Sequence, residues 1–534
     1  QYLRKKYYDS EWTTLSDCEA LHNAYDHGNF INQLSNISGM FSSVIYDKKY
    51  NEVNLLRDRT GQKPLFYALD DDKNLIFSSS LKAIAASGLL EIKIDEEDFQ
   101  FILFNEYAPI GKSGIRKIKS VKPGELVKWK IGSRNFTSNL YWHWEINRSE
   151  IENRPTSRPL ESNVLNALKK SIKEELCSDV PLGILLSSGI DSSLIASLAV
   201  TQTNKKIDTF NVSFDDKSLD ESRIATEIAS KLGTNHTQIN FDKEDIPELI
   251  KIALSKLDIP LGDSSYIPTF LLCKMVSKTH KCVLAGDGGD ELFGGYPTYR
   301  AHRILNLYES LMPQVLRGYI LKNINSVLPI SNKNINLKMK IERFLSGRSS
   351  SLVKRHFMWM STIYNFDLLN RLMLNKLLPN DDMFLEIESL ISVSGIKDPI
   401  SAAQFLDLNN YLPGSIHSKT DNASMMNGVE VRSPFVNKNM LKITSNIPSR
   451  YNVNLFNNKK ILRKIAKEIL PIEMYNLPKK GFNFNVSYVI KNYLANDIKS
   501  KIYSLENIID TKFALSLLQE HISGINNNRK IIWT

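Results

Sequence analysis

The sequence of 534 residues is poor in cysteine and contains no long apolar run. Its four cysteines form no CxxC pair and no zinc-ligand spacing, which argues against a disulfide framework or a zinc site and suits a reducing cytoplasm. No run of about 18 apolar residues and no signal-peptide pattern occurs, so the sequence predicts neither a membrane-spanning helix nor a membrane partner.

Positive charge is not concentrated in this chain. The 68 lysines and arginines are scattered among 58 acidic residues, without a dense basic block and interleaved aromatic side chains. Because nucleic-acid-binding proteins concentrate charge on one face, the pattern predicts a solvated surface and no nucleic-acid partner. With 42% hydrophobic and 24% charged residues, the composition is that of a globular protein of two or three domains.

The chain divides into two regions that differ in the predicted order of their strands and helices. Residues 1–146 hold short apolar and aromatic runs separated at hairpin spacing by polar or Gly/Pro turns, which predicts a β-rich domain. The polar stretch 147–158 is predicted to be a linker. From residue 159 to 534 strands alternate with helices, which predicts a doubly wound parallel sheet with ligands at the carboxyl ends of its strands. The strands expected there are 181–186, 208–214, 237–241 and 282–285.

The most informative segment is 181–193, where an apolar run ends in small residues and an aspartate before a helix. A buried strand that turns sharply into a helix points several backbone N–H groups at one place, backed by the positive end of the helix dipole. Residues 187–193 are therefore predicted to cradle phosphate, with Asp191 placed for the Mg2+ that accompanies a nucleotide. No lysine precedes the serines, so the loop is not of the Walker type, and an ordinary Gly-Ser turn is the alternative.

A second glycine-rich segment, 284–296, follows the last predicted strand. Asp287, Asp290 and Glu291 lie within five positions, among five glycines in a ten-residue span. Carboxylates this close repel one another unless a cation neutralises them, and glycines leave room for a ligand. We expect Mg2+ and nucleotide here rather than a solvated acidic turn.

Two further clusters carry basic residues. One covers residues 419–425 with 430–435, and the other covers 459–463 with 479–482. By composition alone they are helix-surface charges and a loop. In a phosphate-binding enzyme, basic residues near strand ends would instead neutralise the charge that develops as pyrophosphate leaves.

Together these motifs resemble the asparagine synthetase family, which joins a glutamine amidotransferase domain to a synthetase domain of the ATP-pyrophosphatase (PP-loop) type. The family's usual forms are Leu-Ser-Gly-Gly-x-Asp-Ser-Ser, Ser-Gly-Asp/Glu-Gly-x-Asp-Glu-x-Phe-x-Gly-Tyr, Lys-x-Asp-Arg-x-Ser-Met and Glu-x-Arg-x-Pro-Phe-Leu. The matching segments, in the same order, are 186–193, 285–296, 419–425 and 430–435.

The N-terminal region resembles the same family. Residues 57–67 are similar to its Arg-Asp-Arg-x-Gly-x-Lys-Pro-Leu-Tyr-Tyr segment, and residues 16–19 to a Ser-Asp-Thr/Cys-Glu segment whose aspartate, here Asp17, contacts glutamine. The resemblance implies an Ntn-hydrolase-type β-rich sandwich for residues 1–146. For residues 159–534 it implies a doubly wound parallel-sheet domain like the adenine nucleotide alpha-hydrolases.

The chain departs from the family pattern in several places. The family's nucleophilic N-terminal cysteine and its Asn-Gly-Glu segment would lie upstream of Gln1, so we expect an N-terminally truncated chain. By itself this chain is expected to use ammonia but not glutamine, whereas the full-length protein would use glutamine. Cys18 is interpreted as a small semi-buried residue rather than as the nucleophile. Ser188 stands in the phosphate-binding loop where the family pattern has its first Gly. Three further departures bear on the acceptor more than on the nucleotide, and they are Ser80 for Glu, Asn422 for Arg and Asn437 for Asp.

The resemblance implies ATP-dependent amide formation from a carboxylate through an acyl-adenylate, with ammonia from glutamine and with aspartate to asparagine as the default. Asp191 and Asp290 would hold Mg2+, and Asp287 would assist the incoming amine. Lys459, with Lys460 as the less favoured substitute, would stabilise the charged transition states. The residues implied for ATP and pyrophosphate are Leu186, Ser187, Ser188, Gly189, Ile190, Asp191, Ser192, Val212, Ala285 and Gly286.

Other functions stay open at this point. In one alternative, the acceptor is a carboxylate other than aspartate, such as a sugar acid in surface-polysaccharide assembly. A lasso-peptide or β-lactam cyclase and a catalytically dead scaffold are two more. The intact 57–67 segment favours a working glutaminase domain, and the presence of the acidic residues with Lys459 argues against a scaffold. The partners expected are small molecules, and a homodimer is compatible with the sequence.

Overall fold

The computed structural model describes most of the chain in two compact units. The first unit comprises Gln1–Ile94 and Ile110–Trp144, and the second comprises Asp95–Pro109 and Glu145–Thr534. Most of the predicted linker, residues 147–157, and residues 479–482 of the basic cluster lie outside the described residues. The described residues are 2–6, 12–146, 158–217, 219–241, 245–311, 343–344, 347, 351–361, 363, 366–375, 384–471 and 483–534.

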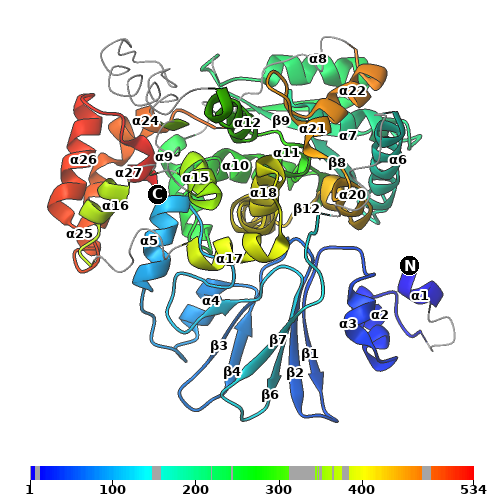
Figure 1. Ribbon diagram of the computed structural model, residues 1–534, viewed down its shortest axis with the longest axis horizontal. Helices are drawn as coiled ribbons and strands as arrows, with labels where there is room; N and C mark the ends of the chain where they lie inside the picture. The colour runs from blue at the N-terminus through cyan, green and yellow to red at the C-terminus, as the bar shows by residue number, and fades with distance from the viewer. Residues whose placement is uncertain are drawn as a thin grey trace. The chain divides into compact units, whose positions relative to one another are not determined.

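The first unit is built on two antiparallel sheets (Figure 1). One has the order β1-β2-β6-β7 and the other the order β4-β3-β5. The β-rich prediction for this region is confirmed, because short apolar runs that alternate sides form hairpins readily. The strands are β1 (Ser42–Asp47), β2 (Glu52–Arg57), β3 (Phe66–Leu69), β4 (Leu75–Ser78), β5 (Lys119–Ser120), β6 (Glu125–Lys130) and β7 (Phe136–Leu140).

The two faces of strand β2 serve two different cores. Leu55 belongs to a cluster that joins both sheets and includes Tyr67 of β3, as in a sandwich. Its neighbour Leu56 points the other way and packs with residues of the short helices, including Leu34. The helices of this unit are α1 (Tyr2–Lys6), α2 (Asp17–Asp26), α3 (Phe30–Leu34) and α4 (Leu81–Ala86).

The Arg-Asp-Arg segment organises the turn after β2. The buried Asp58 carboxylate accepts hydrogen bonds from the backbone N–H groups of Gln62 at 3.0 Å and Lys63 at 2.9 Å. Arg57 donates to the carbonyl oxygens of Lys63 at 2.8 Å and Val121 at 2.9 Å. These side chains therefore hold the backbone of their own unit by charge-assisted hydrogen bonds.

The second unit is built on a parallel sheet of five strands in the order β10-β9-β8-β11-β12. The chain runs outward from β8 to β9 and β10, and then returns to the other side of β8 with β11 and β12. The order thus reverses between β8 and β11, which is where open parallel sheets bind ligands. The strands are β8 (Leu182–Leu185), β9 (Asp208–Ser213), β10 (Asn235–Asn240), β11 (Cys282–Leu284) and β12 (Glu430–Arg432), so the doubly wound prediction is confirmed.

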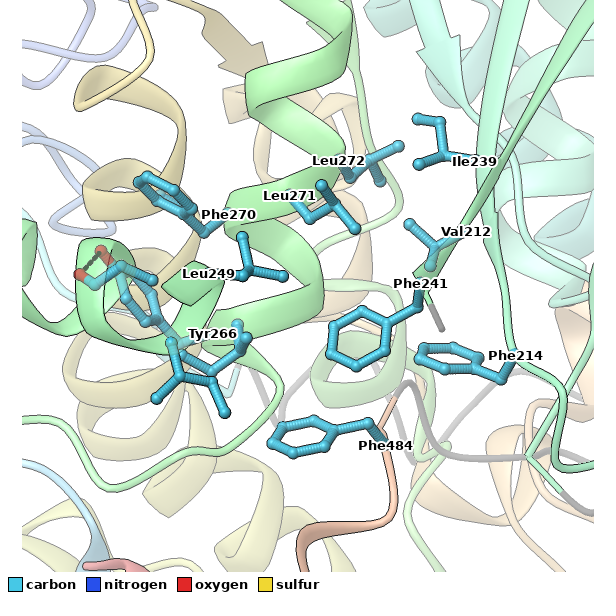
Figure 2. Packing of buried hydrophobic residues seen from close by; sticks show 14 of the residues in the cluster. Val212, Phe214, Ile239, Phe241, Leu249, Tyr266, Phe270, Leu271, Leu272 and Phe484 are labelled. Carbon is cyan, nitrogen blue, oxygen red and sulfur yellow. Dashed lines mark hydrogen bonds between the residues drawn. The ribbon is translucent and has the colours of Figure 1, made fainter. Parts of the chain in front are cut away.

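An apolar core fixes this sheet against helices α9 (Ile246–Lys256) and α10 (Tyr266–Val276). Phe210, Val212 and Phe214 alternate along one face of β9 and its carboxyl end, as a strand with one face on this core requires. Figure 2 shows Phe214, Phe241 and Phe484 side by side, with ring centroids 5.4 Å and 5.3 Å apart. The core therefore ties the sheet to the chain beyond residue 483.

The remaining helices of this unit flank the sheet or extend away from it to one side (Figure 1). Those that position the site are α6 (Arg158–Glu175), α7 (Ile190–Val200), α11 (Gly289–Phe293), α19 (Ser418–Met425), α22 (Lys460–Ile469) and α27 (Arg529–Trp533). The others are α5 (Glu96–Asn105), α8 (Ser222–Leu232), α12 (Pro297–Leu311), α15 (Leu352–Met360), α16 (Phe366–Leu372), α17 (Leu385–Ser394), α18 (Pro399–Leu406), η3 (Asp407–His417), η4 (Pro434–Val436), α20 (Lys438–Thr444), α21 (Ser449–Asn452), α24 (Val486–Val489), η5 (Ile490–Leu494), α25 (Ala495–Ser504) and α26 (Thr511–Ser523).

No helix within the described ranges combines the length and the apolar character that crossing a bilayer demands.

Candidate active site

The loop between β8 and α7 is held in shape by its own hydroxyl groups. Ser187 Oγ accepts a hydrogen bond from the N–H of Gly189 at 3.0 Å, and it lies 2.9 Å from Ser192 Oγ. Ser192 Oγ also accepts from the N–H of Ser187 at 3.1 Å, which closes the loop on itself. Helix α7 then begins at Ile190, so its N-terminal dipole points at the carboxyl edge of the sheet.

The glycine-rich loop after β11 packs directly against the loop after β8. A Cβ atom placed on Gly289 would lie 2.7 Å from Asp191 Cγ, and one on Gly286 would lie 3.1 Å from Asp191 Cβ. Both separations are shorter than ordinary van der Waals contact, so a side chain at either position would press against Asp191. The two predicted loops are therefore in contact at the point where the strand order reverses.

Lys459 brings a cation into the centre of this arrangement. It precedes helix α22, with a left-handed φ of 53°, and its side chain is buried. Its ammonium forms an ion pair with Asp290 Oδ1 at 2.6 Å and a second one with Asp191. Lys460, the less favoured substitute, instead donates to the carbonyl oxygen of Arg450 at 3.2 Å.

Charge governs the protonation of Lys459. Burial by itself lowers the pKa of the ammonium, but the carboxylates of Asp191 and Asp290 outweigh it and raise the pKa above the usual lysine value. The lysine is therefore cationic at every physiological pH, as stabilisation of a leaving pyrophosphate requires.

Asp191 and Asp290 fit the expectation for a magnesium site. Their carboxylates converge on one cation, the Lys459 ammonium, and oxygen is the donor that Mg2+ prefers. Mg2+ is commonly held by one or two protein carboxylates together with substrate phosphates, so two acids are enough. No group of three or more His, Cys, Asp and Glu side chains forms a metal cage within the described residues.

A second polar cluster lies beside Asp287. Thr420 Oγ1 donates to Asp287 Oδ2 at 2.8 Å. The neighbouring Lys419 ammonium contacts Asp263 Oδ2 at 3.0 Å and Ser265 Oγ at 2.9 Å. Burial first, and then the Asp290 charge, raises the pKa of Asp287, while Lys419 and Thr420 oppose the shift.

Sequence reasoning missed Asp263 and Ser265. They follow a short Pro-Leu-Gly stretch outside the recognised motifs, and their only signal is an Asp-Ser-Ser run that opens helix α10. Asp263 remains ionised because the Lys419 charge and the Ser265 hydrogen bonds lower its pKa despite the opposing effect of burial.

The other predicted residues occupy different places. The side chain of Val212, on β9, points into the apolar core of the second unit. Only the backbone of Val212 can therefore face a ligand at the carboxyl edge of the sheet. Its neighbour Asn211 is buried, and the Asn211 Oδ1 atom has no hydrogen-bond partner among the described residues. Ala285 is buried, and its N–H donates to the carbonyl oxygen of Arg432 at 2.9 Å. Leu186 and Ser188 are buried at the end of β8.

Three departures from the family pattern have local structural roles. Asn437 caps helix α20 by accepting from the N–H of Asn439 at 3.1 Å. Ser80 caps helix α4 by accepting from the N–H of Ala83 at 3.0 Å. Asn422 is buried and accepts from the Tyr266 hydroxyl at 3.0 Å.

In the first unit, Asp17 opens helix α2 and is exposed. Cys18, which follows it, is also exposed, so the interpretation of Cys18 as semi-buried is wrong. It lies in the first turn of helix α2, whose buried residues are Ala20 and Ala24. No glutamine-site partner of Asp17 is identified among the described residues.

Glu291 is expected to make the stability of the protein fall as the pH rises. The Tyr296 hydroxyl donates to this buried carboxyl, yet burial first and the Asp290 charge second raise the pKa of Glu291 to about 8. The folded protein thus keeps a proton that the unfolded chain releases near pH 4.5. The resulting stabilisation is complete below that pH and is lost towards pH 8, at up to about 1.4 kcal/mol per pH unit.

Urea unfolding at pH 5, 6.5 and 8 measures this effect. The Glu291→Gln variant should have a flatter pH dependence than the unmodified protein. A Glu506→Gln variant is the control, because Glu506 is exposed. Parallel pH curves for the unmodified and the Glu291→Gln proteins would show that Glu291 is ionised throughout.

The fold and this edge of the sheet define a nucleotide-binding α/β unit joined to a β-sandwich unit. Comparison with protein families assigns a separate family model to each of these two parts of the chain. Residues 163–534 match the asparagine synthase model, and residues 1–142 match the glutamine amidotransferase domain model. The chain belongs to the asparagine synthase family, whose reaction class is ATP-dependent amidation with glutamine as nitrogen source.

Curated relatives agree with this membership. The glutamine-hydrolyzing asparagine synthetase 1 of Bacillus subtilis (strain 168) is 28% identical over 526 residues, which cover 98% of this chain and 80% of that protein. The glutamine-hydrolyzing asparagine synthetase 3 of Arabidopsis thaliana is 30% identical over 310 residues, 55% of this chain and 46% of its own. A protein named amidase chry2 from Gibberella zeae is 24% identical over 510 residues, 88% of this chain and 72% of its own.

Among solved structures, an NMN synthetase from Francisella tularensis matches 39% of this chain and 94% of its own. The TM-score is 0.22 and the sequence identity is 17%.

Proposed function

We propose that this protein converts aspartate to asparagine, with ATP as the activating substrate and ammonia from glutamine as the nitrogen donor. The observation that carries the proposal is the contact of Lys459 with both Asp191 and Asp290, on two loops that meet where the strand order reverses. Relatives named asparagine synthetase support aspartate as the acceptor.

ATP is proposed to bind with its phosphates on residues 186–192 and its base beside β9. The Ser187–Ser192 hydrogen bonds pre-organise the loop, so little ordering is needed when phosphate binds. The buried Asn211 Oδ1 is an acceptor that the amino group of adenine can satisfy. Asp191 and Asp290 would hold Mg2+, which supplies charge neutralisation for the phosphates when it is bound.

The first chemical step is attack of the acceptor carboxylate on the α-phosphorus of ATP. The bond from this phosphorus to the bridging oxygen breaks, pyrophosphate leaves, and an acyl-adenylate forms. The Lys459 ammonium is proposed to stabilise the negative charge that gathers on the departing pyrophosphate, and its ion pairs with Asp191 and Asp290 support that role. An ionised carboxylate is a poor acyl donor, and the mixed anhydride removes that obstacle.

The second step is attack of ammonia on the carbonyl of the acyl-adenylate, which expels AMP. The attacking nitrogen must lose a proton, and Asp287 is the carboxylate proposed to accept it. Its raised pKa, caused first by burial, makes it a stronger base than an exposed aspartate. Thr420 orients this carboxylate through its hydrogen bond to Asp287 Oδ2.

Glutamine would supply ammonia in the first unit, where Asp17 is the proposed contact for the substrate. Free ammonia is mostly protonated near neutral pH and then carries no lone pair, so local generation keeps it nucleophilic.

Pyrophosphate release from ATP tests the proposal. The full chain is incubated with Mg2+ and ammonium chloride, with and without aspartate, and asparagine is quantified. Aspartate-dependent pyrophosphate release with equimolar asparagine supports the proposal. ATP binding without aspartate-dependent release contradicts aspartate as the acceptor.

A second acceptor class is favoured by one comparison. The relative named amidase chry2 covers 88% of this chain although its name is not that of an asparagine synthetase. ATP–pyrophosphate exchange with a panel of carboxylic acids separates the two proposals. Exchange that depends on another acid and not on aspartate would favour amidation of that acid.

A further inference from the structure

Side-chain amides from distant elements hold the acidic loop in place. Helix α11, which carries Asp290, has only five residues, and the last carbonyl oxygens of a helix have no partner within it. The buried Gln404 amide donates to the carbonyl oxygens of Glu291 at 3.0 Å and Leu292 at 2.9 Å. Gln404 belongs to helix α18, so these bonds fix the helix of Asp290 independently of Lys459.

A second amide joins the same loop to the Lys459 segment. Asn458 Nδ2 donates to the carbonyl oxygens of Gly295 and Tyr296, at 2.9 Å each. Both partners are acceptors, so only the amino group of the amide fits them, and both of its hydrogens are used there. One side chain thus connects the residue before Lys459 to the residues that follow helix α11.

Hydrogen bonds also fix the backbone of Lys459. This residue has a φ of 53°, a left-handed conformation that costs a non-glycine residue free energy and persists only where the surroundings impose it. Arg463 Nε donates to the carbonyl oxygen of Asn458 at 3.0 Å, and the N–H of Arg463 donates to the carbonyl oxygen of Lys459 at 2.8 Å. The peptide groups on both sides of Lys459 are therefore held.

Gly295 is the residue where the two segments touch. A Cβ atom on Gly295 would overlap both Lys459 Cε and Asp290 Oδ1. The Lys459 side chain therefore lies directly against the residue whose carbonyl oxygen Asn458 holds, and its ammonium reaches Asp290 Oδ1 at 2.6 Å. A shift of Gly295 relative to Asn458 would change this ammonium–carboxylate distance.

We propose that Asn458 is a positioning residue, which sets the place of the Lys459 ammonium beside Asp290 by fastening the lysine segment to the acidic loop. Asn458 acts through Lys459 and lies outside the recognised motifs. The proposal rests on the proposed function, because departure of pyrophosphate is the step that needs this ammonium.

The Asn458→Leu variant tests the proposal, because leucine has the branching of asparagine but donates no hydrogen bond. We expect kcat for aspartate-dependent pyrophosphate release to fall roughly 10- to 100-fold, since a displacement of about 1 Å at a reacting centre has an effect of that size. The KM for ATP should stay unchanged, because residues 186–192 are the proposed phosphate cradle. Asn458→Ala should have the same effects.

A double-mutant cycle with Lys459→Ala distinguishes positioning from a general structural role. In the Lys459→Ala background, Asn458→Leu should lower single-turnover pyrophosphate release by less than about 3-fold, because a residue that acts through Lys459 then has nothing left to position. Losses that multiply would show that Asn458 acts independently of Lys459, and they would overturn the proposal.

Acylation by acetic anhydride gives a readout that needs no turnover. The Lys459 side chain is only 8% exposed, so it should be labelled slowly in the full chain without ATP or Mg2+. In Asn458→Leu, local opening should speed the labelling of Lys459 at least about 10-fold relative to Lys499, an exposed lysine on helix α25. Mass spectrometry of the labelled peptides measures this ratio.

Gln404→Leu is the matched control, because it removes two bonds of the same kind from the same loop and leaves the Lys459 segment fastened. It should lower the unfolding temperature without changing the labelling of Lys459. Equal labelling of Lys459 in Asn458→Leu and in the unmodified protein would overturn the proposal. Faster labelling in Asn458→Leu, with no aspartate-dependent pyrophosphate release by the unmodified protein, would contradict the proposed function and leave the positioning of Lys459 intact.

Discussion

Replacing Lys459 with alanine is expected to reduce pyrophosphate release by roughly 100- to 1,000-fold while ATP binding is largely kept. The ammonium is the cation that contacts both carboxylates at the meeting point of the two loops. Its loss removes stabilisation of the developing pyrophosphate charge, whereas residues 186–192 still provide the phosphate cradle. Single-turnover pyrophosphate release and equilibrium binding of ATP measure the two quantities separately.

The neighbouring lysine supplies the control for this experiment. Lys460 is bonded to a backbone carbonyl and not to the two aspartates, so Lys460→Ala should retain nearly full turnover. Unchanged turnover of Lys459→Ala, or a comparable loss in Lys460→Ala, would refute the assignment of Lys459.

Replacing Gly295 with alanine is expected to lower kcat by at least about 100-fold, although the residue itself carries no reacting group. The added methyl group would overlap Asp290 Oδ1 and Lys459 Cε, so both side chains must move. Movement of about 1 Å at a reacting centre is enough for a loss of this size. Steady-state pyrophosphate release with thermal unfolding separates lost geometry from lost stability.

Gly233→Ala is a demanding control for the Gly295 variant. Gly233 has a φ of 69° at the end of helix α8 and open space around its Cα, so alanine there strains the backbone without touching the site. It should lower the unfolding temperature and leave kcat unchanged. Retention of full activity by Gly295→Ala would mean that Asp290 and Lys459 need not hold the observed positions.

Local patterns in the sequence were sufficient for the fold class and for the two glycine-rich loops. Apolar runs that end in Gly and Ser next to a helix pattern predict strand, loop and helix from neighbouring residues alone, and β8 with α7 and β11 with α11 follow that rule. The family motifs are equally local. Asp191 and Asp290 could therefore be proposed together before any strand order was known.

The consequences of single departures could not be predicted in the same way. Asn437 differs from the family pattern in the sequence, yet its side chain caps helix α20 and donates to Glu174 at 3.0 Å. Asn422 differs as well, but it is buried against Tyr266. Comparison of motifs shows that a residue differs from the family pattern. The structural effect of the difference depends on the residues it contacts, and these come from distant parts of the chain.

The sequence by itself determined the two-part architecture, the phosphate-type loop and the acidic loop, because each depends on residues within about one strand and one helix. Only the tertiary structure decided which lysine meets the two aspartates and that Asp263 holds Lys419. These groups are separated by more than 100 residues along the chain, and sheet order and helix packing bring them together. Hydrophobic periodicity specifies which face of an element is buried but not which distant element covers it.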